Sequence, residues 1–462
     1  MSVIRHPSTG TAVTVKQWRY TATGGETTLS GTDGFGLSLS YTVGAEEVYI
    51  NGVLLVRGTD YTASTGTSIT GLTALVAGDV ATVMSANSFN VANAIAASTV
   101  TAKGDLIVAN GASSVSNLAV GADGTTLVAN SSSSTGVAWA GPAFVAGKNK
   151  IINGDFGVWQ RGTSFSPTYN AFTADRWIED ATTAYPTSQT ISQQTFTPGS
   201  APVAGYEGQY YLQFAYTYAA GNGGQFLSQR IENVQTLAGQ TATLSFWVKV
   251  ASAASLGNAV LIQNFGSGGS GSVTTTVGAA SATTSWQRVS FTVSIPSIAG
   301  KTVGAGSYLD LRIFMPTASS TTSIWGVQLE AGSVATAFQT ATGTVQGELA
   351  ACQRYYWRTA NNGGAYQMIG RATAFSGTQA DLFLSLPVTM RTSYATIDYN
   401  SIALTPYAGT GTIAVTAVTA QTSDGQLSNV RLTVGSGLSA GALYTVLYNG
   451  NSSAYLGLGA EL

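Results

Sequence analysis

The chain has 462 residues, of which 9% are charged and 44% hydrophobic, and its formal net charge is −2. At roughly 150 residues per domain, this length predicts about three domains. The composition argues against a disordered chain, which would need low hydrophobicity and high net charge. It also argues against a nucleic-acid-binding protein, which would carry a basic patch. No run of about 18 apolar residues occurs, so we expect no membrane insertion.

Single copies of cysteine and histidine exclude several kinds of site. Cys352 is the only cysteine and His6 the only histidine, so the chain can form no internal disulfide bond and no zinc site of Cys and His ligands. A Ser-His-Asp triad would need His6, close to the N-terminus. The first residues, MSVIRHPSTG, lack the apolar core of a signal peptide. This pattern favours release by cell lysis over secretion.

Residues 1–86 show the signals of a small antiparallel sandwich or barrel. Two β-rich runs, EEVYI and VLLV, flank Asn51-Gly52. This dipeptide is typical of a type I′ turn, because both central residues of that turn need positive φ.

Residues 87–147 form either a flexible linker or an intertwined shaft. The first part, residues 87–99, is compatible with a short capped helix or with a linker. Further on, LIVANGASS and TLVANSSSS resemble each other about twenty residues apart. Short apolar strands of this kind cannot close a core alone, and stacking against copies of the chain would bury them. The pattern therefore favours a homo-oligomeric shaft, with a flexible Ser/Gly linker as the alternative.

Residues 148–345 contain successive strand candidates with no helical crossover between them. Leu244, Phe246 and Val248 alternate cleanly, as expected for a strand with one face in a core. Such antiparallel strands favour a jelly-roll sandwich. We expect its first strand in KNKIINGDFGVWQRG, residues 148–162, which is the densest polar stretch of the chain and which we interpret as structural.

One short helix is expected next, connecting two domains. In residues 346–358, Leu349, Cys352 and Tyr356 lie at helical spacing on one face, which predicts a core position for Cys352. Strand signals return in residues 359–462 and indicate a second sandwich. The predicted fold class is thus all-β: multidomain antiparallel sandwiches of the jelly-roll type, joined by a linker or shaft, with one short helix.

Several ordered motifs resemble a module of tail fibres and related structural proteins of tailed bacteriophages. They are NKIINGDFGVWQRGTSF, FTADRW, LSFWVKV, WQRVSFTV, GVQLEAGSVATAF and ELAACQRYYWR. The resemblance spans about residues 148–358, and the flanking segments also resemble fibre and adaptor pieces. The module looks like the carbohydrate-binding jelly rolls attached to glycosidases. The resemblance implies a virion surface protein, often trimeric, that attaches the particle to a host glycan.

The resemblance also suggests site residues. An acid near the first strand of such jelly rolls can hold a structural calcium ion, which here points to Asp155 with Asp310 or Glu330. However, related modules carry a Glu where this chain has Gly157. An aromatic face can stack on a sugar ring, and the tryptophans of strand motifs are better explained by core packing. The candidates for glycan contact are therefore three tyrosines in expected loops: Tyr169, Tyr185 and Tyr206.

The sequence thus predicts a non-enzymatic virion protein, a homotrimeric tail fibre that binds a host surface glycan. Residues 1–86 would contact the baseplate, neck or capsid. The first alternative is a head fibre or capsid decoration protein. The second is a capsule-degrading glycosidase, for which two of the nine acids between residues 143 and 354 would have to flank the scissile bond.

Overall fold

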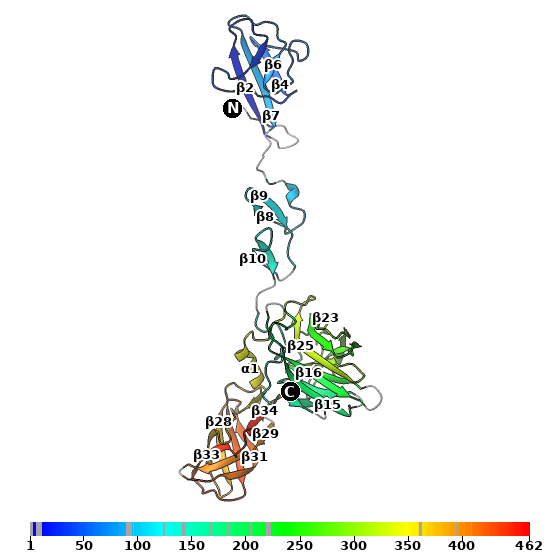
Figure 1. The fold of residues 1–462 in the computed structure, drawn as a ribbon, viewed down its shortest axis with the longest axis vertical. Helices are drawn as coiled ribbons and strands as arrows, with labels where there is room; N and C mark the ends of the chain where they lie inside the picture. Colours follow the sequence, from blue (N-terminus) through cyan, green and yellow to red (C-terminus); the bar gives the residue numbers. More distant parts are fainter. Residues whose placement is uncertain are drawn as a thin grey trace. The chain divides into compact units, whose positions relative to one another are not determined.

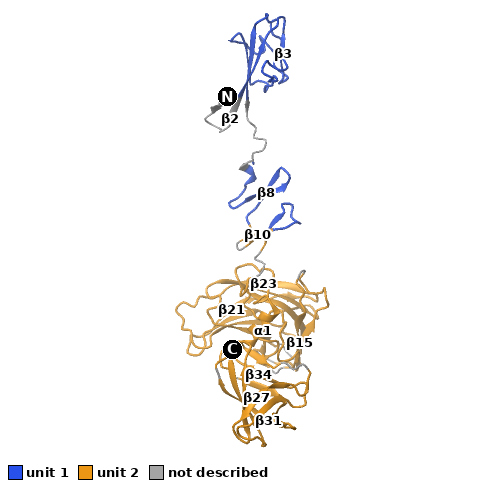
Figure 2. Cartoon of the chain, turned by 90° about the vertical axis from the view of Figure 1, so that its left-hand side faces the viewer, with its two compact units in different colours: residues 1–120, 129–138 blue, residues 121–128, 139–462 orange. Residues whose placement is uncertain are grey.

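Antiparallel strands make up almost all of the regular structure. The computed structural model describes residues 3–5, 12–88, 95, 97–122, 125–140, 145–166, 169–182, 185–203, 206–218, 223–359, 363–393, 396–407 and 409–462, so His6 lies outside it. These residues contain one α-helix, and none of their helices is long and apolar enough to cross a membrane. The all-β prediction is confirmed. The chain divides into two compact units, residues 1–120 with 129–138 and residues 121–128 with 139–462 (Figure 2).

The first unit begins with a small β-domain. Its five-stranded sheet has the order β1-β2-β7-β4-β5, and β3 pairs separately with β6. Trp18, Val48, Ile69 and Val83 are buried in its core. The strands are β1 (Val3–Arg5), β2 (Ala12–Thr21), β3 (Thr28–Ser30), β4 (Glu46–Ile50), β5 (Val53–Leu54), β6 (Ser68–Thr70) and β7 (Val80–Ser88).

The predicted turn between β4 and β5 is confirmed. Ile50 pairs with Val53 across it, and both central residues have positive φ, 49° at Asn51 and 86° at Gly52. Asparagine and glycine are the residues that adopt this conformation most readily. The Asn51 side chain also accepts a hydrogen bond from the Val80 backbone N–H at 2.8 Å, which ties the turn to β7.

Two hairpins follow in residues 106–140. They pair β8 (Leu106–Gly111) with β9 (Ser114–Leu118), and β10 (Thr126–Ala129) with β11 (Val137–Ala140). These are the two segments whose sequences resemble each other. The helix considered for residues 87–99 falls mostly outside the described residues, and its described end contains a 3-10 turn, η1 (Ala97–Thr99).

Two six-stranded antiparallel sheets form the jelly-roll part of the second unit (Figure 1). The sheet β12-β15-β16-β25-β18-β23 contains β12 (Ser164–Phe165), β15 (Ser188–Thr195), β16 (Tyr210–Thr217), β25 (Ser320–Ala331), β18 (Thr241–Val250) and β23 (Gln287–Ser294). The sheet β13-β14-β17-β24-β20-β21 contains β13 (Ala171–Phe172), β14 (Ile178–Ala181), β17 (Gln225–Glu232), β24 (Tyr308–Phe314), β20 (Ala259–Asn264) and β21 (Val273–Gly278). A short pair, β19 (Ala254–Ser255) and β22 (Ser281–Ala282), lies outside both sheets.

The stretch 148–162 is structural, but the expectation that it starts a strand is wrong. Asn153 and Phe156 have φ of 55° and 56°, a left-handed conformation that interrupts an extended strand. Both residues are fully buried. The Asn153 side chain donates to the backbone oxygens of Val158 and Asp175 and accepts from the Val158 N–H, so it replaces the hydrogen bonds that a neighbouring strand would supply.

The α-helix of the described residues, α1 (Val345–Gln353), is shorter than expected, and the face that it buries differs from the predicted face. Thr344 caps its N-terminus by accepting from the Gly347 N–H at 3.0 Å. Cys352 is buried as predicted, but Leu349 is exposed and Glu348 is buried instead. The Glu348 carboxylate accepts hydrogen bonds from Asn153 and Thr342 inside the protein, which fixes this orientation. The last predicted helical residues form strand β26 (Tyr356–Arg358).

The C-terminal strands close into a barrel rather than the expected second sandwich. The barrel order is β27-β28-β32-β31-β30-β33, so each strand pairs on both sides and no edge remains. Its strands are β27 (Met368–Ala374), β28 (Gln379–Ser385), β30 (Ile402–Pro406), β31 (Ile413–Ser423), β32 (Leu427–Val434) and β33 (Leu443–Tyr448). A three-stranded sheet, β26-β34-β29, adds β29 (Thr396–Asn400) and β34 (Tyr455–Gly459).

The residues after β34 tie the barrel to the jelly roll. The Glu461 carboxylate is 3.1 Å from the Arg161 guanidinium and also contacts Arg176. Both arginines belong to the jelly-roll part and are largely buried. Each also lies over a tyrosine ring at the start of β26, at 3.5 Å for Arg161 over Tyr356, the first residue of the strand, and 3.6 Å for Arg176 over Tyr355, the residue before it.

Candidate functional site

One face of the sheet β12-β15-β16-β25-β18-β23 is turned away from the core. Ile191, Phe214, Val248 and Ile324 point inward and are fully buried. Because side chains alternate along a strand, the residues between them lie on the outer face. This outer face is polar at one end and aromatic at the other.

The cross-strand register places its side chains in rows. Thr190 pairs with Ala215, and Ala215 pairs with Thr321, so these three residues form the first row across β15, β16 and β25. Residues directly opposite each other in an antiparallel pair share one face of the sheet. The first row therefore presents two hydroxyl groups around a small methyl group.

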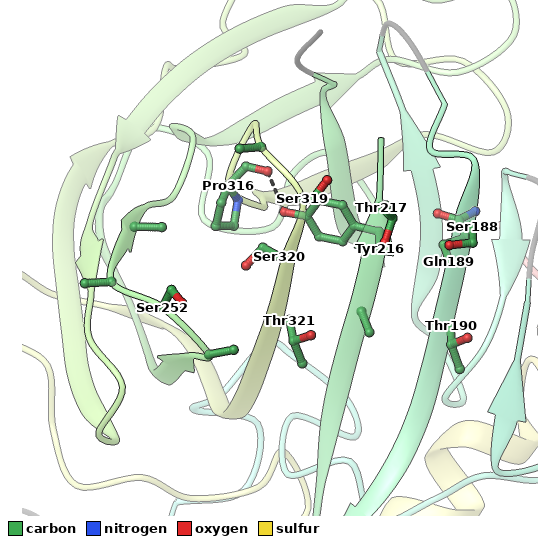
Figure 3. Close-up of a pocket in the computed structure, with 15 residues that line it drawn as sticks. Ser188, Gln189, Thr190, Tyr216, Thr217, Ser252, Pro316, Ser319, Ser320 and Thr321 are labelled. Carbon is green, nitrogen blue, oxygen red and sulfur yellow. Dashed lines mark hydrogen bonds between the residues drawn. The ribbon is translucent and has the colours of Figure 1, made fainter. Parts of the chain in front are cut away.

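A groove of about 560 Å³ lies over this first row (Figure 3). Its walls come from the start of β15, the end of β16 and the start of β25, together with residues 251–254 and the turn 316–319. Tyr216 lies at the groove with its ring buried, and its hydroxyl donates to the Pro316 carbonyl oxygen. The described lining residues are mostly short alcohols or alanine, and they include no acid, lysine, arginine, histidine or cysteine: Ser188, Gln189, Thr190, Ala215, Tyr216, Thr217, Ala251, Ser252, Ala253, Ala254, Pro316, Ala318, Ser319, Ser320 and Thr321.

The second row extends the polar surface. Ser192 pairs with Gln213, Gln213 with Ser323, and Ser323 with Lys249. Each of these residues is two positions along its strand from a residue of the groove, a distance of about 7 Å. The row adds an amide and an amine to the hydroxyl groups.

Aromatic rings form the other end of the outer face. Tyr211 and Trp286 are half-buried, and their ring centroids are 5.3 Å apart at an interplanar angle of 87°. Phe196 packs against both rings, and Trp247, Trp325 and Phe338 lie buried beside it. The tryptophans of β18 and β25 are therefore packing residues, as expected, although their cluster lies on the outer face of the sheet and not between the sheets.

Two of the three candidate tyrosines come together at the edge of this sheet. The rings of Tyr169 and Tyr185 are stacked, with centroids 4.7 Å apart and an interplanar angle of 27°, and both side chains are about half exposed. They line a second hollow of about 570 Å³. Ser188, Gln189 and Thr190 line both this hollow and the groove, so the two depressions adjoin along β15.

Tyr206 lies elsewhere, in a contact with Asp155. Its ring packs against Trp325 and Phe338, with centroids 5.5 Å and 5.3 Å away. Its hydroxyl is hydrogen-bonded to the Asp155 carboxylate, and burial raises the pKa of Tyr206. Tyr206 and Asp155 line a hollow of about 120 Å³ that shares no lining residue with the groove of the first row.

Each of the three calcium candidates interacts with a different partner. Asp155 accepts from the Gly157 N–H, and burial, followed by the nearby Glu348 carboxylate, raises the pKa of Asp155 to about 6. Asp310 pairs with Arg312 at 2.8 Å, and Glu330 pairs with Lys148 at 3.3 Å. In the described part of the chain, no three His, Cys, Asp or Glu residues gather in a way that could hold a metal ion.

The outer face of the sheet was not predicted as a site. Thr190, Gln213 and Thr321 are ordinary strand residues in the sequence, and only the register brings them together. The one sequence signal is the richness of residues 188–194 and 319–323 in Ser, Thr and Gln.

Comparisons with known proteins find distant structural likenesses. No protein-family model and no curated protein matches the chain. The enzymatically active domain of tailspike protein 4 of bacteriophage CBA120 is similar at 12% identity and a TM-score of 0.24. The match covers 40% of this chain and only 22% of that one.

Two carbohydrate-binding modules are similar over almost their whole length. The CBM22-1 xylan-binding domain of Paenibacillus barcinonensis Xyn10C is 15% identical, with a TM-score of 0.24, covering 42% of this chain and 100% of that one. TmCBM61, solved in complex with β-1,4-galactotriose, is 14% identical, with a TM-score of 0.22, covering 40% and 99%. At TM-scores this low, none of these likenesses assigns a ligand or an activity to this chain.

Proposed function

We propose that this chain binds a surface glycan through the outer face of the sheet β12-β15-β16-β25-β18-β23. The observation that carries the proposal is the groove of about 560 Å³ whose lining consists largely of hydroxyl groups and small side chains. A sugar offers many hydroxyl groups that both donate and accept hydrogen bonds, and serine and threonine do the same. Small residues between them let a ring approach the sheet.

The rest of the outer face supports the same ligand class. Gln213 and Ser192 are partly exposed and supply an amide and a further hydroxyl in the second row, and Tyr211 and Trp286 supply aromatic surface beyond it. Binding sites for small molecules combine apolar surface with a few placed polar groups. A polyhydroxylated chain with apolar ring faces suits this combination.

The same lining supports a proposal of binding without turnover. Glycoside hydrolysis needs a pair of carboxyl groups on either side of the scissile bond. Among the residues that the structure describes, those lining the groove include no carboxyl group. We therefore propose a non-enzymatic role.

We further propose that the chain is a homotrimeric virion fibre, with residues 1–86 attached to another virion protein. The motifs in residues 148–358 support this assignment because they resemble those of phage fibres. The hairpins of residues 106–140 support oligomerisation, because they leave large apolar side chains exposed, including Ile107 and Leu127. Three weak sites on one fibre would act together and raise the avidity for a surface that repeats the same glycan.

The test is glycan binding by the full chain and by T190W on an array of immobilised polysaccharides. Thr190 is exposed and lines both the groove and the adjoining hollow, so an indole there should block ligand entry without disturbing the core. We expect the wild type to bind at least one polysaccharide and T190W to lose at least about tenfold in apparent affinity.

The matched control is T276W. Thr276 is an exposed threonine on β21, in the opposite sheet. The T276W variant should bind the polysaccharide as the wild type does. Equal binding by T190W and the wild type would place the glycan site elsewhere and contradict the proposal.

A further inference from the structure

Lys249 stands at the junction between the polar and the aromatic parts of the outer face. It pairs with Ser323 in the second row, and Ala251, two residues further along, lines the groove. Its side chain is half-buried. Its amine therefore lies beside the path of any ligand that extends from the groove towards Tyr211 and Trp286.

Aromatic rings hold this amine in place. The Lys249 Nζ atom lies 5.2 Å from the ring centroid of Tyr211 and 5.0 Å from that of Trp286. A cation at this distance from a ring face is attracted by the ring quadrupole. A ring accepts no conventional hydrogen bond, so the three N–H donors of the amine remain available to a ligand.

The charge of Lys249 is not neutralised by the protein. No carboxylate in the described part of the chain lies within ion-pair distance of it. The one acid on the outer face of strands β15, β16, β18, β23 and β25 is Glu330, which is fully buried and paired with Lys148. The other nearby cation, Arg288, stacks on Trp247 and donates to Ser245 and Thr336. This face therefore carries net positive charge, in a chain whose overall net charge is −2.

We infer that the glycan bound here carries a negatively charged sugar, and that Lys249 binds its carboxylate. The inference rests on the proposed glycan-binding function and adds the chemical class of the ligand. The hydroxyl groups of the groove would bind neutral ring positions, and the amine would form a charge-assisted hydrogen bond with the acidic substituent. A neutral glycan would use the same groove without this contact.

The test compares K249M with the wild type on matched pairs of polymers: polygalacturonate, alginate and hyaluronate, each beside its own methyl ester. The ester keeps the sugar backbone, removes the charge and adds one methyl group to each carboxyl. Methionine keeps an unbranched stem against Tyr211 and Trp286. The control is K301M, which removes one positive charge from an exposed turn of the same unit.

We expect the wild type and K301M to prefer at least one acidic polymer over its ester by about three- to fivefold, the range of a partly exposed ion pair. K249M should lose this preference and bind the ester as the wild type does. Added salt should weaken the preference.

An equal preference in K249M and the wild type, or no preference in either, would overturn the inference while leaving glycan binding intact. Failure of the proposed function would look different. The wild type would then bind neither member of any pair, or T190W would bind both as well as the wild type does.

Discussion

At the scale of single residues, buried carboxyl groups govern how the jelly roll responds to pH. Glu179 on β14 is fully buried, opposite Leu227, which belongs to the core between the sheets. Burial raises the pKa of Glu179 from 4.5 to about 7, against a smaller lowering effect of the Gln189 side chain. Burial also raises the pKa of Asp175 to about 6.

The direction of these pKa shifts determines whether the folded state is more stable at low or at high pH. The folded state binds these protons more tightly than the unfolded state, so between about pH 4.5 and pH 7 folding takes up protons. The contribution of Glu179 to the stability of the folded state is fully present below this pH window and is lost as the pH rises through it. The jelly roll should therefore be less stable at pH 8 than at pH 5 on account of this residue.

We predict that E179Q raises the stability of the jelly roll at pH 8 by about 2 kcal/mol and changes it little at pH 5, because the amide resembles the neutral acid. Urea denaturation followed by tryptophan fluorescence at both pH values measures the effect. The same change in stability at pH 5 and pH 8 would show that Glu179 does not titrate as described.

At the scale of elements, the end of the chain after β34 joins two domains through one carboxylate. Glu461 contacts Arg161 and Arg176, whose side chains are 14% and 2% exposed. Removing one partner of a buried ion pair leaves the other charge unpaired, which is costly. Glu461 is the described acid that contacts both arginines, so the effect should be large.

We predict that E461A destabilises the second unit by about 3 kcal/mol and separates the unfolding of the barrel from that of the jelly roll. Differential scanning calorimetry should then show two transitions. The control is D381A, which removes the partner of Arg431 in a more exposed pair on the barrel and should cost about 1 kcal/mol or less. Similar effects of the two substitutions would contradict the role given to Glu461.

The sequence predicted elements better than it predicted their assembly. Local signals sufficed for the Asn51-Gly52 turn and for the strand containing Leu244 and Phe246, because turn chemistry and alternation act over a few residues. The burial of Glu348 in place of Leu349 was missed, since it depends on hydrogen bonds to Asn153, 195 residues away. Barrel closure also depends on distant pairings, such as that of Ala372 on β27 with Tyr444 on β33, 72 residues away.

For the candidate site, too, the sequence indicated residue types but not how they assemble. Aromatic and hydroxyl residues could be recognised as sugar-binding types, and the pairing of Tyr169 with Tyr185 shows that the tyrosine hypothesis had some value. The groove itself could not be predicted, because Thr190, Ala215 and Thr321 become neighbours only through the strand register.

At the scale of the whole molecule, the exposed apolar residues of the hairpins bear on oligomerisation. Ile107 on β8 and Leu127 on β10 are each 40% exposed. Such short two-stranded hairpins are only marginally stable in water on their own. Packing against the same segments of other copies would bury these side chains.

We predict that the purified chain has a mass of about three times 47.2 kDa by light scattering, and that I107S/L127S shifts it towards monomer. The control is V303S, which changes an apolar residue of equal exposure, 40%, in the jelly-roll part. A monomeric wild type would refute the trimer, and a trimer that survives I107S/L127S unchanged would refute the role of the hairpins in holding it together.

The central claim is that a glycan lies in the groove on the outer face of the sheet. The most direct measurement is a crystal structure of the chain with an oligosaccharide from the polysaccharide that binds best on the array. We predict electron density for sugar rings over Thr190, Ala215 and Thr321, with one end directed towards Lys249. Density confined to the Tyr169–Tyr185 hollow, to the barrel or to the first unit would contradict this location of the site.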